Sequence, residues 1–330
     1  MPKAVVLFSG GLDSLVTLHF LRSLGVDVAP LNVVTPFHDV SEVARQRAEQ
    51  YGFEFHVRRT GEEYPELVVS PKWGYGCALN PCIDCRVRMC QIAKDFMKEI
   101  GADFVATGEI AGQRPNSQKQ HQLALIARES GLDGYLVRPL SAQVLLPTKA
   151  ETEGLLDREK LMKFCGRGRG KLIRLAQTFG IKDIPQPASG CLLCEKTFVP
   201  RVRDTIRHNP KPSSWDFEIL RFGRVLRLDN EVHCLIARRL ADCQGLAELF
   251  TRKDRSPCVL LEPENFNGPA LLMVGPMGNH HLSLAGALVL RFSKPDKFDP
   301  ASALVRFRDD RTDQVITIFP SEEADQFAYF

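Results

Sequence analysis

The chain has 330 residues, more than one ordinary hydrophobic core holds, so we expect two domains. Hydrophobic residues make up 44% and charged residues 25%, which excludes a disordered or membrane-embedded protein. The formal net charge of +3 excludes a uniformly basic surface, so any polyanion must bind a local cluster. There is no signal-peptide pattern, and no apolar run approaches the roughly 18 residues of a membrane helix. We therefore expect a cytoplasmic protein that does not contact a membrane.

The first elements alternate between apolar runs and helical stretches. Residues 4–8 form an apolar run of strand length, and residues 14–24 place leucines at helical spacing. Residues 26–36 repeat the strand pattern, residues 40–51 form a charged helical stretch, and residues 51–60 contain a third strand. This alternation predicts an α/β fold with a doubly wound parallel sheet.

The pattern continues and then changes character. Residues 86–100 predict an amphipathic helix, and residues 101–109 a strand that ends in a polar turn at the ligand-binding edge of the sheet. Residues 158–181 predict two short helices separated by a Gly/Arg turn, and residues 184–194 a proline-bounded loop. We assign residues 1–200 to the first domain. Residues 201–214 are expected to be a linker and residues 215–330 a smaller α+β domain.

A glycine pair stands where the first strand becomes a helix. Gly10 and Gly11 let the backbone approach a phosphate, while Ser9, Ser14 and the helix N-terminus offer hydrogen-bond donors. The Walker A and dinucleotide-binding patterns are both absent. Asp13 would repel bare phosphate, which indicates a Mg²⁺ ion between its carboxylate and a pyrophosphate. The alternative is a helix cap after a tight turn.

Four of the ten cysteines form two C-x-x-C pairs, Cys82 with Cys85 and Cys191 with Cys194. Pro81 predicts a helix beginning near Cys82, where the helix dipole would lower the pKa of both thiols. The pairs could ligate zinc or an iron–sulfur cluster, or act as redox cysteines that carry a persulfide. The other six are interpreted as isolated, buried cysteines: Cys77, Cys90, Cys165, Cys234, Cys243 and Cys258.

The stretch Ser9 to Ser14 resembles the SGGxDS signature of the PP-loop ATP pyrophosphatases, which have an adenine nucleotide α-hydrolase-like fold. The resemblance implies that ATP is cleaved between its α and β phosphates to adenylate an oxygen. It implies Asp13 as a catalytic Mg²⁺ ligand. Its implied ATP contacts are Ser9, Gly10, Gly11, Asp13, Ser14, Asn32, Val33, Val34, Thr107 and Gly108.

Three further stretches resemble sulfur-inserting members of this group. Residues 106–118 and 137–151 are similar to segments of tRNA 4-thiouridine synthetases, and residues 80–85 to tRNA 2-thiouridylases. The resemblance implies ATP-dependent thiolation of a tRNA uridine, with sulfur from a cysteine desulfurase or inorganic sulfide. It places Glu109 and Gln113 beside the substrate, although a polar turn capping the next helix would use the same residues.

The cysteine spacing departs from well-studied 2-thiouridylases, which use two lone cysteines. Some thiouridine synthetases instead hold a cluster through a C-x-x-C and one distant cysteine. Cys82, Cys85 and Cys191 match that set as catalytic residues and ligands of a [4Fe-4S] cluster, with Cys194 as a fourth metal ligand. Zinc, or persulfide chemistry without a metal, remains the alternative.

Local positive charge offers contacts for RNA. Arg167, Arg169 and Lys171 form a cluster that could bind the tRNA backbone, or a solvated loop. The C-terminal domain resembles the RNA-binding region of NFACT-type proteins around Gly223 and Arg224, although it could instead be structural or mediate a homodimer. The alternative function is a PP-loop sulfurtransferase or amide-forming ligase that acts on a small molecule.

Overall fold

The computed structural model describes residues 1–185, 190–293 and 303–327. Part of the expected proline-bounded loop, residues 186–189, lies outside the described residues. No helix within the described ranges is both long and apolar enough to cross a membrane.

The chain forms two compact units, Met1–Glu195 and Lys196–Phe330. The expected linker, residues 201–214, falls inside the second unit, and helix α8 (Val199–His208) occupies its first part. Val199, Val202 and Thr205 of this helix are buried. They are three residues apart, so they form one buried face of the helix.

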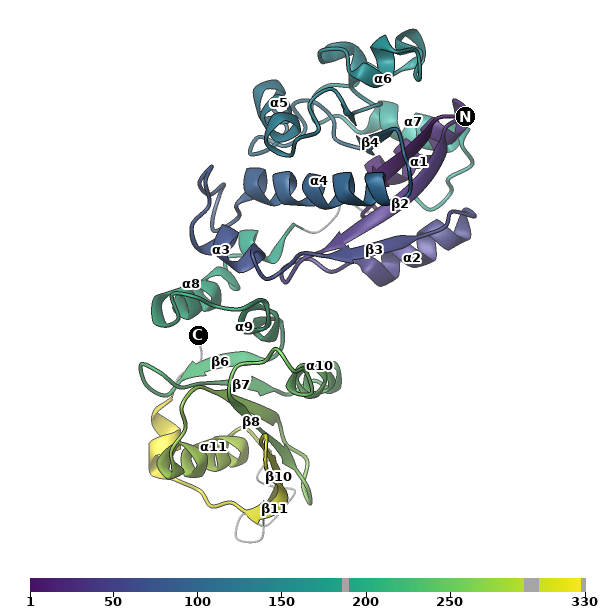
Figure 1. Ribbon diagram of the computed structural model, residues 1–330. Coiled ribbons are helices and arrows are strands. Elements are labelled where there is room, and N and C mark those ends of the chain that lie inside the picture. The colour runs from purple at the N-terminus through teal and green to yellow at the C-terminus, as the bar shows by residue number, and fades with distance from the viewer. Residues whose placement is uncertain (186–189, 294–302, 328–330) are drawn as a thin grey trace. The chain divides into compact units, whose positions relative to one another are not determined.

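The first unit contains the predicted parallel sheet (Figure 1). Its strands are β1 (Lys3–Leu7), β2 (Asp27–Val34), β3 (His56–Arg59), β4 (Phe104–Thr107) and β5 (Leu136–Val137). They run in the order β3-β2-β1-β4-β5, and all pairs are parallel. The chain order reverses at β1, so the crevice at the carboxyl ends of β1, β2 and β4 is the expected ligand site of such a sheet.

Helices cover both faces of this sheet, as the doubly wound fold requires. Residues Ala4 and Val6 of β1 pack in one core with α1, α2 and α7, while Val5 and Leu7 pack in another with α4 and α5. The alternation along β1 therefore divides the two cores. The α-helices are α1 (Leu12–Ser23), α2 (Ser41–Gln50), α3 (Tyr64–Val69), α4 (Cys82–Glu99), α5 (Gln120–Glu129), α6 (Lys149–Thr152) and α7 (Gly170–Thr178). Short 3-10 helices span Ala142–Val144, Arg158–Lys160 and Leu192–Cys194.

The second unit is the expected α+β domain, built on a sheet whose described strand pairs are all antiparallel. Its strands are β6 (Arg224–Arg227), β7 (His233–Ala237), β8 (Cys258–Pro263), β9 (Ala270–Val274), β10 (Leu304–Arg308) and β11 (Asp313–Thr317), in the order β11-β10-β8-β9-β7-β6. Its other helices are α9 (Ser214–Glu218), α10 (Leu240–Phe250) and α11 (Asn279–Arg291), with 3-10 turns at Ile219–Arg221 and Glu322–Gln326. Leu284 and Leu288 of α11 join a core with Val259, Leu261 and Met273 of the sheet.

Candidate active site

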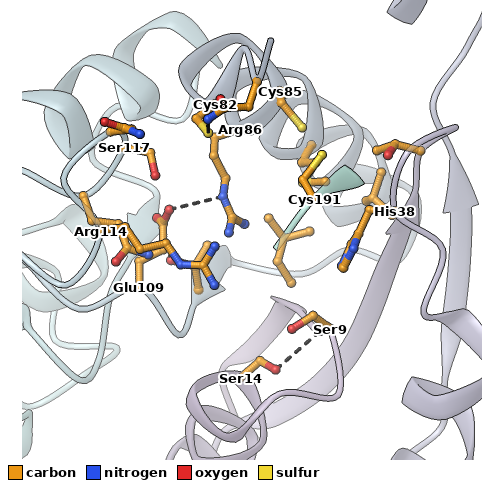
Figure 2. A pocket seen from close by; sticks show the side chains of 18 of the residues that line it. Ser9, Ser14, His38, Cys82, Cys85, Arg86, Glu109, Arg114, Ser117 and Cys191 are labelled. Carbon is orange, nitrogen blue, oxygen red and sulfur yellow. Dashed lines mark hydrogen bonds and ion pairs between the residues drawn. The ribbon is translucent and has the colours of Figure 1, made fainter. Parts of the chain in front are cut away.

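A cavity of about 440 Å³ lies at the carboxyl edge of the parallel sheet, within the size range of small-molecule sites. One side is formed by Ser9, Asp13 and Ser14 at the turn from β1 into α1. Figure 2 shows Ser9 and Ser14 on one side and Cys82 and Cys85 on the other. Of the predicted site residues, those that line the cavity are Ser9, Asp13, Ser14, Asn32, Val33, Cys82, Cys85, Thr107, Gly108, Glu109, Cys191 and Cys194. Gly10, Gly11, Val34, Gln113, Arg167, Arg169 and Lys171 are not among the lining residues.

The glycine pair gives the loop its shape. Gly10 has a φ of +70°, a conformation that favours glycine. A Cβ added to Gly10 would also lie only 3.1 Å from the Cα atom of Ala44. Ser14 Oγ donates to the Gly11 carbonyl at 3.0 Å and accepts from the Ser9 amide at 3.4 Å. Gly11 is the N-cap residue of α1, and Ser9, Asp13 and Ser14 of the loop and the first helical turn line the cavity. A phosphate bound there would lie near the positive end of the helix dipole.

Asp13 lies where the loop meets several cationic and polar groups. Burial raises the pKa of its carboxyl, while a hydrogen bond from Gln113 and the charges of Arg169 and Arg114 oppose that rise. Gln113 therefore contacts the loop from outside the cavity lining. Arg169 is half-buried and donates to the Pro185 carbonyl at 3.1 Å, so it belongs to the surroundings of Asp13.

The remaining members of the predicted basic cluster have a different setting. Arg167 and Lys171 are exposed and do not line the cavity. They are accessible to a large ligand at the surface of the first unit.

The end of β4 packs directly on the loop. A Cβ on Gly108 would lie 2.6 Å from both the carbonyl carbon and the carbonyl oxygen of Asp13, so only glycine fits without displacement. On the neighbouring strand, Asn32 Nδ2 donates to the Phe8 carbonyl at 2.7 Å. The ends of β1, β2 and β4 are thereby held together around the cavity.

Among the buried polar atoms of the cavity within the described structure, Glu109 Oε1 has an ion pair but no hydrogen bond, whereas Asn32 Oδ1 and Gln118 Oε1 have neither. An unpaired buried oxygen costs free energy, so such groups commonly face a ligand or water. These two oxygens therefore indicate that the cavity receives a polar, hydrogen-bonding molecule.

Glu109 has a buried carboxylate that forms ion pairs with two arginines. It is only 4% exposed, it pairs with the equally buried Arg138 at 3.0 Å, and it lies 3.7 Å from Arg86 Nε. Burial alone would raise the pKa of Glu109, but the charges of Arg138 and Arg86 outweigh it and lower the pKa. Figure 2 shows Arg86 reaching from α4 toward Glu109. Glu109 thus orients Arg86, which itself lines the cavity.

The first cysteine pair lies at the start of α4, as Pro81 predicted. Tyr64, whose side chain is buried, donates from its hydroxyl to Cys85 Sγ at 3.3 Å, and Asn80 Nδ2 donates to Cys82 Sγ at 3.0 Å. The expected lowering of the thiol pKa at the helix start is wrong for Cys85. Burial raises its pKa, and the Tyr64 hydrogen bond and the Arg86 charge only partly oppose this.

The second cysteine pair reaches the same cavity from a distant part of the chain. Burial raises the pKa of Cys191 to about 12, with a smaller contribution from neighbouring Cys85. The hydrogen bonds from Leu192 N to the Phe37 carbonyl and from Leu79 N to the Leu193 carbonyl, at 3.4 and 3.2 Å, attach this segment to the first unit.

Several residues that line the cavity were not predicted from the sequence: Tyr64, Cys77, Asn80, Arg86 and Arg114. Arg86 follows Cys85 directly, so its place on the same helix was the available signal. Cys77 was interpreted as isolated, yet it lines the cavity with the four paired cysteines. Its exposure also differs from the expectation of burial.

The four paired cysteines fit the predicted metal centre in chemistry but not in arrangement. Soft thiol ligands suit zinc or an iron–sulfur cluster, and Cys82, Cys85, Cys191 and Cys194 all line one cavity. However, no three His, Cys, Asp or Glu side chains among the described residues are arranged as metal ligands. The conformation therefore brings the thiols together without a formed coordination site.

Comparison with known protein families agrees with this division of the chain. Residues 2–145 match the family model described as tRNA methyl transferase HUP domain. Residues 223–330 match the family model described as NFACT protein RNA binding domain.

Individual relatives are similar to the first unit. The tRNA-specific 2-thiouridylase MnmA of a Nitratiruptor species is 35% identical over 120 residues, covering 33% of this chain and 35% of the relative. The same enzyme of Sulfurimonas denitrificans is 36% identical over 119 residues, covering 33% and 35%. The chain thus spans about a third of the length of these curated relatives.

Among solved structures, a 4-thiouridine synthetase–RNA complex with bound ATP is 21% identical, with a TM-score of 0.35. It covers 55% of this chain and 52% of that one. Residues 2–145 are therefore similar to the tRNA methyl transferase HUP family and to tRNA-specific 2-thiouridylases, and residues 223–330 are similar to the NFACT RNA-binding family.

Proposed function

We propose that the protein is an ATP-dependent tRNA sulfurtransferase that replaces a carbonyl oxygen of uridine with sulfur. The observation that carries this proposal is that the PP-loop residues Ser9, Asp13 and Ser14 share one cavity with Cys82 and Cys191. Adenylation chemistry and sulfur chemistry therefore have a common reaction space. The sulfur-inserting relatives of the first unit support the same assignment.

The proposed nucleotide site uses the edge of the sheet. The N-terminus of α1, together with Ser9 and Ser14, would bind the phosphates of ATP, and Asp13 would hold Mg²⁺ between them. Asn32 and Val33 at the end of β2, with Thr107 and Gly108 after β4, would contact the remainder of the nucleotide. Burial raises the pKa of Asp13, and Gln113 and two arginines oppose that rise, so these three residues favour the carboxylate form that Mg²⁺ binding needs.

The first chemical step activates the base. The uridine carbonyl oxygen attacks the α phosphate of ATP, the bond between the α and β phosphates breaks, and pyrophosphate leaves. Arg86 and Arg114 line the cavity and would neutralise the charge that develops on the phosphate oxygens. The product is an adenylated uridine, whose ring carbon now carries a good leaving group.

The second step transfers sulfur. The outer sulfur of a cysteine persulfide attacks the activated carbon, and AMP leaves with the former carbonyl oxygen. A second thiol then attacks the inner sulfur, which forms a disulfide and releases the thiouridine; a thiol reductant restores the pair. Cys85 and Cys191 line the same cavity, and Cys85 contributes to the raised pKa of Cys191, so we assign the persulfide and the resolving thiol to this pair.

The predicted cluster has a separate test. Cys82, Cys85 and Cys191 are the residues that would hold a [4Fe-4S] cluster, which would supply a binding site for hydrosulfide in the cavity. Protein purified without oxygen would then be brown and contain iron and sulfide in cluster proportions. Colourless protein without iron would contradict the cluster, and the cysteine persulfide would then be the source of the transferred sulfur.

RNA binding is assigned to both units. The NFACT match covers residues 223–330, and Arg167 and Lys171 provide exposed positive charge on the first unit. We propose that these surfaces bind the tRNA backbone, while the cavity receives the target base.

The function is tested by incubating the purified protein with tRNA, Mg²⁺-ATP and a persulfide donor, followed by nucleoside mass spectrometry. We expect a new thiouridine and release of AMP. Release of ADP, or absence of any thiolated nucleoside, would contradict the proposal. AMP formation that needs a small acceptor but no tRNA would favour the small-molecule ligase instead.

A further inference from the structure

Cys77 differs from the other thiols of the cavity because it is exposed to solvent. It lines the same cavity as Cys82, Cys85, Cys191 and Cys194, all of which are only partly accessible. A side chain that is both exposed and part of the cavity lining lies at its mouth. Cys77 is therefore the thiol that a sulfur donor outside the cavity reaches first.

The loop around Cys77 is built on a buried amide. Asn80 is 3% exposed, and its Oδ1 accepts hydrogen bonds from the Ala78 amide at 2.9 Å and from Cys77 Sγ at 3.5 Å. Its Nδ2 donates to Cys82 Sγ at 3.0 Å. A Cβ on Gly76 would lie 2.4 Å from this nitrogen, so the loop is closely fitted to the Asn80 side chain. One amide thus fixes Cys77 relative to the first cysteine pair.

Cys77 also lies close to the second cysteine pair. Cys77 and Cys194 both line the cavity, and the Cys77 thiol contributes to the raised pKa of Cys194. A backbone hydrogen bond joins the two segments, because Leu79 N donates to the Leu193 carbonyl at 3.2 Å. Cys194 is half-buried, and Cys191 lies three residues before it on the cavity wall. The thiols form a series from solvent into the cavity.

We propose that Cys77 accepts sulfur from a persulfide donor at the cavity mouth and passes it to Cys194. In the first step, the Cys77 thiolate attacks the outer sulfur of the donor persulfide, the donor's S–S bond breaks, and its thiolate leaves. In the second step, the Cys194 thiolate attacks the outer sulfur of the Cys77 persulfide and releases Cys77. Each step exchanges one S–S bond for another, so no oxidant or reductant is consumed.

The relay rests on the proposed function only for the final destination of the sulfur. The two exchanges need neither ATP nor tRNA, so they can be measured when no thiouridine forms. Cys165 supplies the control, because it is also exposed but does not line the cavity.

The test uses glutathione persulfide as the donor. The protein is exposed to it for increasing times and alkylated, and peptide mass spectrometry locates each additional sulfur atom. We expect Cys77 to gain sulfur first and Cys194 later. In Cys77→Ser, sulfur should reach Cys194 on the order of tenfold more slowly, whereas Cys165→Ser should leave that rate unchanged. In Cys194→Ser, the Cys77 persulfide should persist longer than in the unchanged protein.

Three results would overturn the relay. The first is an unchanged rate of sulfur arrival at Cys194 in Cys77→Ser. The second is modification of Cys165 without modification of Cys77. The third is a disulfide between Cys77 and Cys194 formed without a preceding Cys77 persulfide. The thermal unfolding midpoint establishes that each variant is folded. Absence of thiouridine in the tRNA assay, with the relay intact, would instead contradict the proposed function.

Discussion

The cavity has two walls of different construction. The nucleotide wall, formed by Ser9, Asp13, Ser14, Asn32, Thr107 and Gly108, lies at the ends of three adjacent parallel strands. The thiol wall, formed by Cys77, Cys82, Cys85, Cys191 and Cys194, comes from the start of α4, one loop and one short 3-10 helix. Sheet pairing fixes the first wall, whereas single hydrogen bonds between distant segments fix the second. The wall fixed by sheet pairing therefore suits binding, and the wall fixed by single hydrogen bonds suits a group that exchanges covalent partners.

The largest effect on stability is expected from the buried ion pair between Glu109 and Arg138, which lies between the two walls. Glu109→Gln leaves Arg138 buried without its carboxylate, which should lower the free energy of unfolding by about 3 to 5 kcal/mol. Denaturant unfolding measures this loss. Glu99→Gln is the matched control: it removes a carboxylate that is 58% exposed and pairs with Arg58, so it should cost less than about 1 kcal/mol. Equal losses would show that Glu109 does not join the walls.

The nucleotide wall itself is tested at Gly108. Gly108→Ala forces a methyl group against the Asp13 backbone, and we expect a loss of about 1 to 3 kcal/mol with weaker ATP binding. Gly168→Ala is the control, because no atom lies within 4 Å of its added Cβ. Calorimetric ATP binding and thermal unfolding give the two readouts. Normal ATP binding by the Gly108→Ala variant would mean that the loop tolerates displacement.

Acid should weaken the nucleotide wall through His19 on α1. Burial, with a smaller contribution from Arg22, lowers the pKa of His19 to about 4, and its ring packs against Tyr51, Phe53 and Phe179. The unfolded chain takes up a proton near pH 6.5, which the folded chain accepts only near pH 4. Stability is therefore complete above about pH 6.5 and declines as the pH falls toward 4.

The expected loss at pH 5 is on the order of 1 to 2 kcal/mol relative to pH 7. His19→Gln cannot take up this proton, so urea unfolding of the variant should depend less on pH over the same interval. The same slope in both proteins would exclude His19 as its origin.

The smallest effect is expected on the thiol wall. Tyr64→Phe removes the hydrogen bond that favours the Cys85 thiolate, so Cys85 alkylation at neutral pH should slow several-fold, equivalent to about 1 kcal/mol. Mass spectrometry of alkylated peptides follows Cys85 separately from the other thiols. Tyr135→Phe, which changes a partly exposed tyrosine away from the cavity, should leave the rate unchanged. Faster alkylation in Tyr64→Phe would mean that the hydroxyl shields the thiol rather than activating it.

Sequence patterns predicted the nucleotide wall more completely than the thiol wall. Apolar runs and the glycine pair are local signals, and parallel pairing brings the ends of their strands together, so Ser9, Asn32 and Thr107 could be assigned to one edge. The start of the helix at Cys82 could also be predicted from a local signal, because Pro81 directly precedes it. The burial that raises the pKa of Cys85 depends on packing of the whole unit, which the helix dipole alone does not describe.

The other misses have the same origin. Cys77 has no partner at a recognisable spacing, and its neighbour Cys194 is joined to it only through long-range contacts such as that between Leu79 and Leu193. Arg138 meets Glu109 across 29 residues, so no local pattern identifies the pair. Residues 201–208 were expected in a linker, because the Pro and Ser residues that follow them obscured a helix with a narrow buried face.

The most direct test of a shared reaction space measures pyrophosphate and thiouridine in the same reaction with tRNA, ATP and a persulfide donor. We predict that the unchanged protein releases pyrophosphate only with tRNA and forms thiouridine. Asp13→Asn should lose both products, whereas Cys85→Ser should keep tRNA-dependent pyrophosphate release and form no thiouridine. Thiouridine formation by Cys85→Ser at the unchanged rate, or pyrophosphate release that is independent of tRNA, would contradict the account.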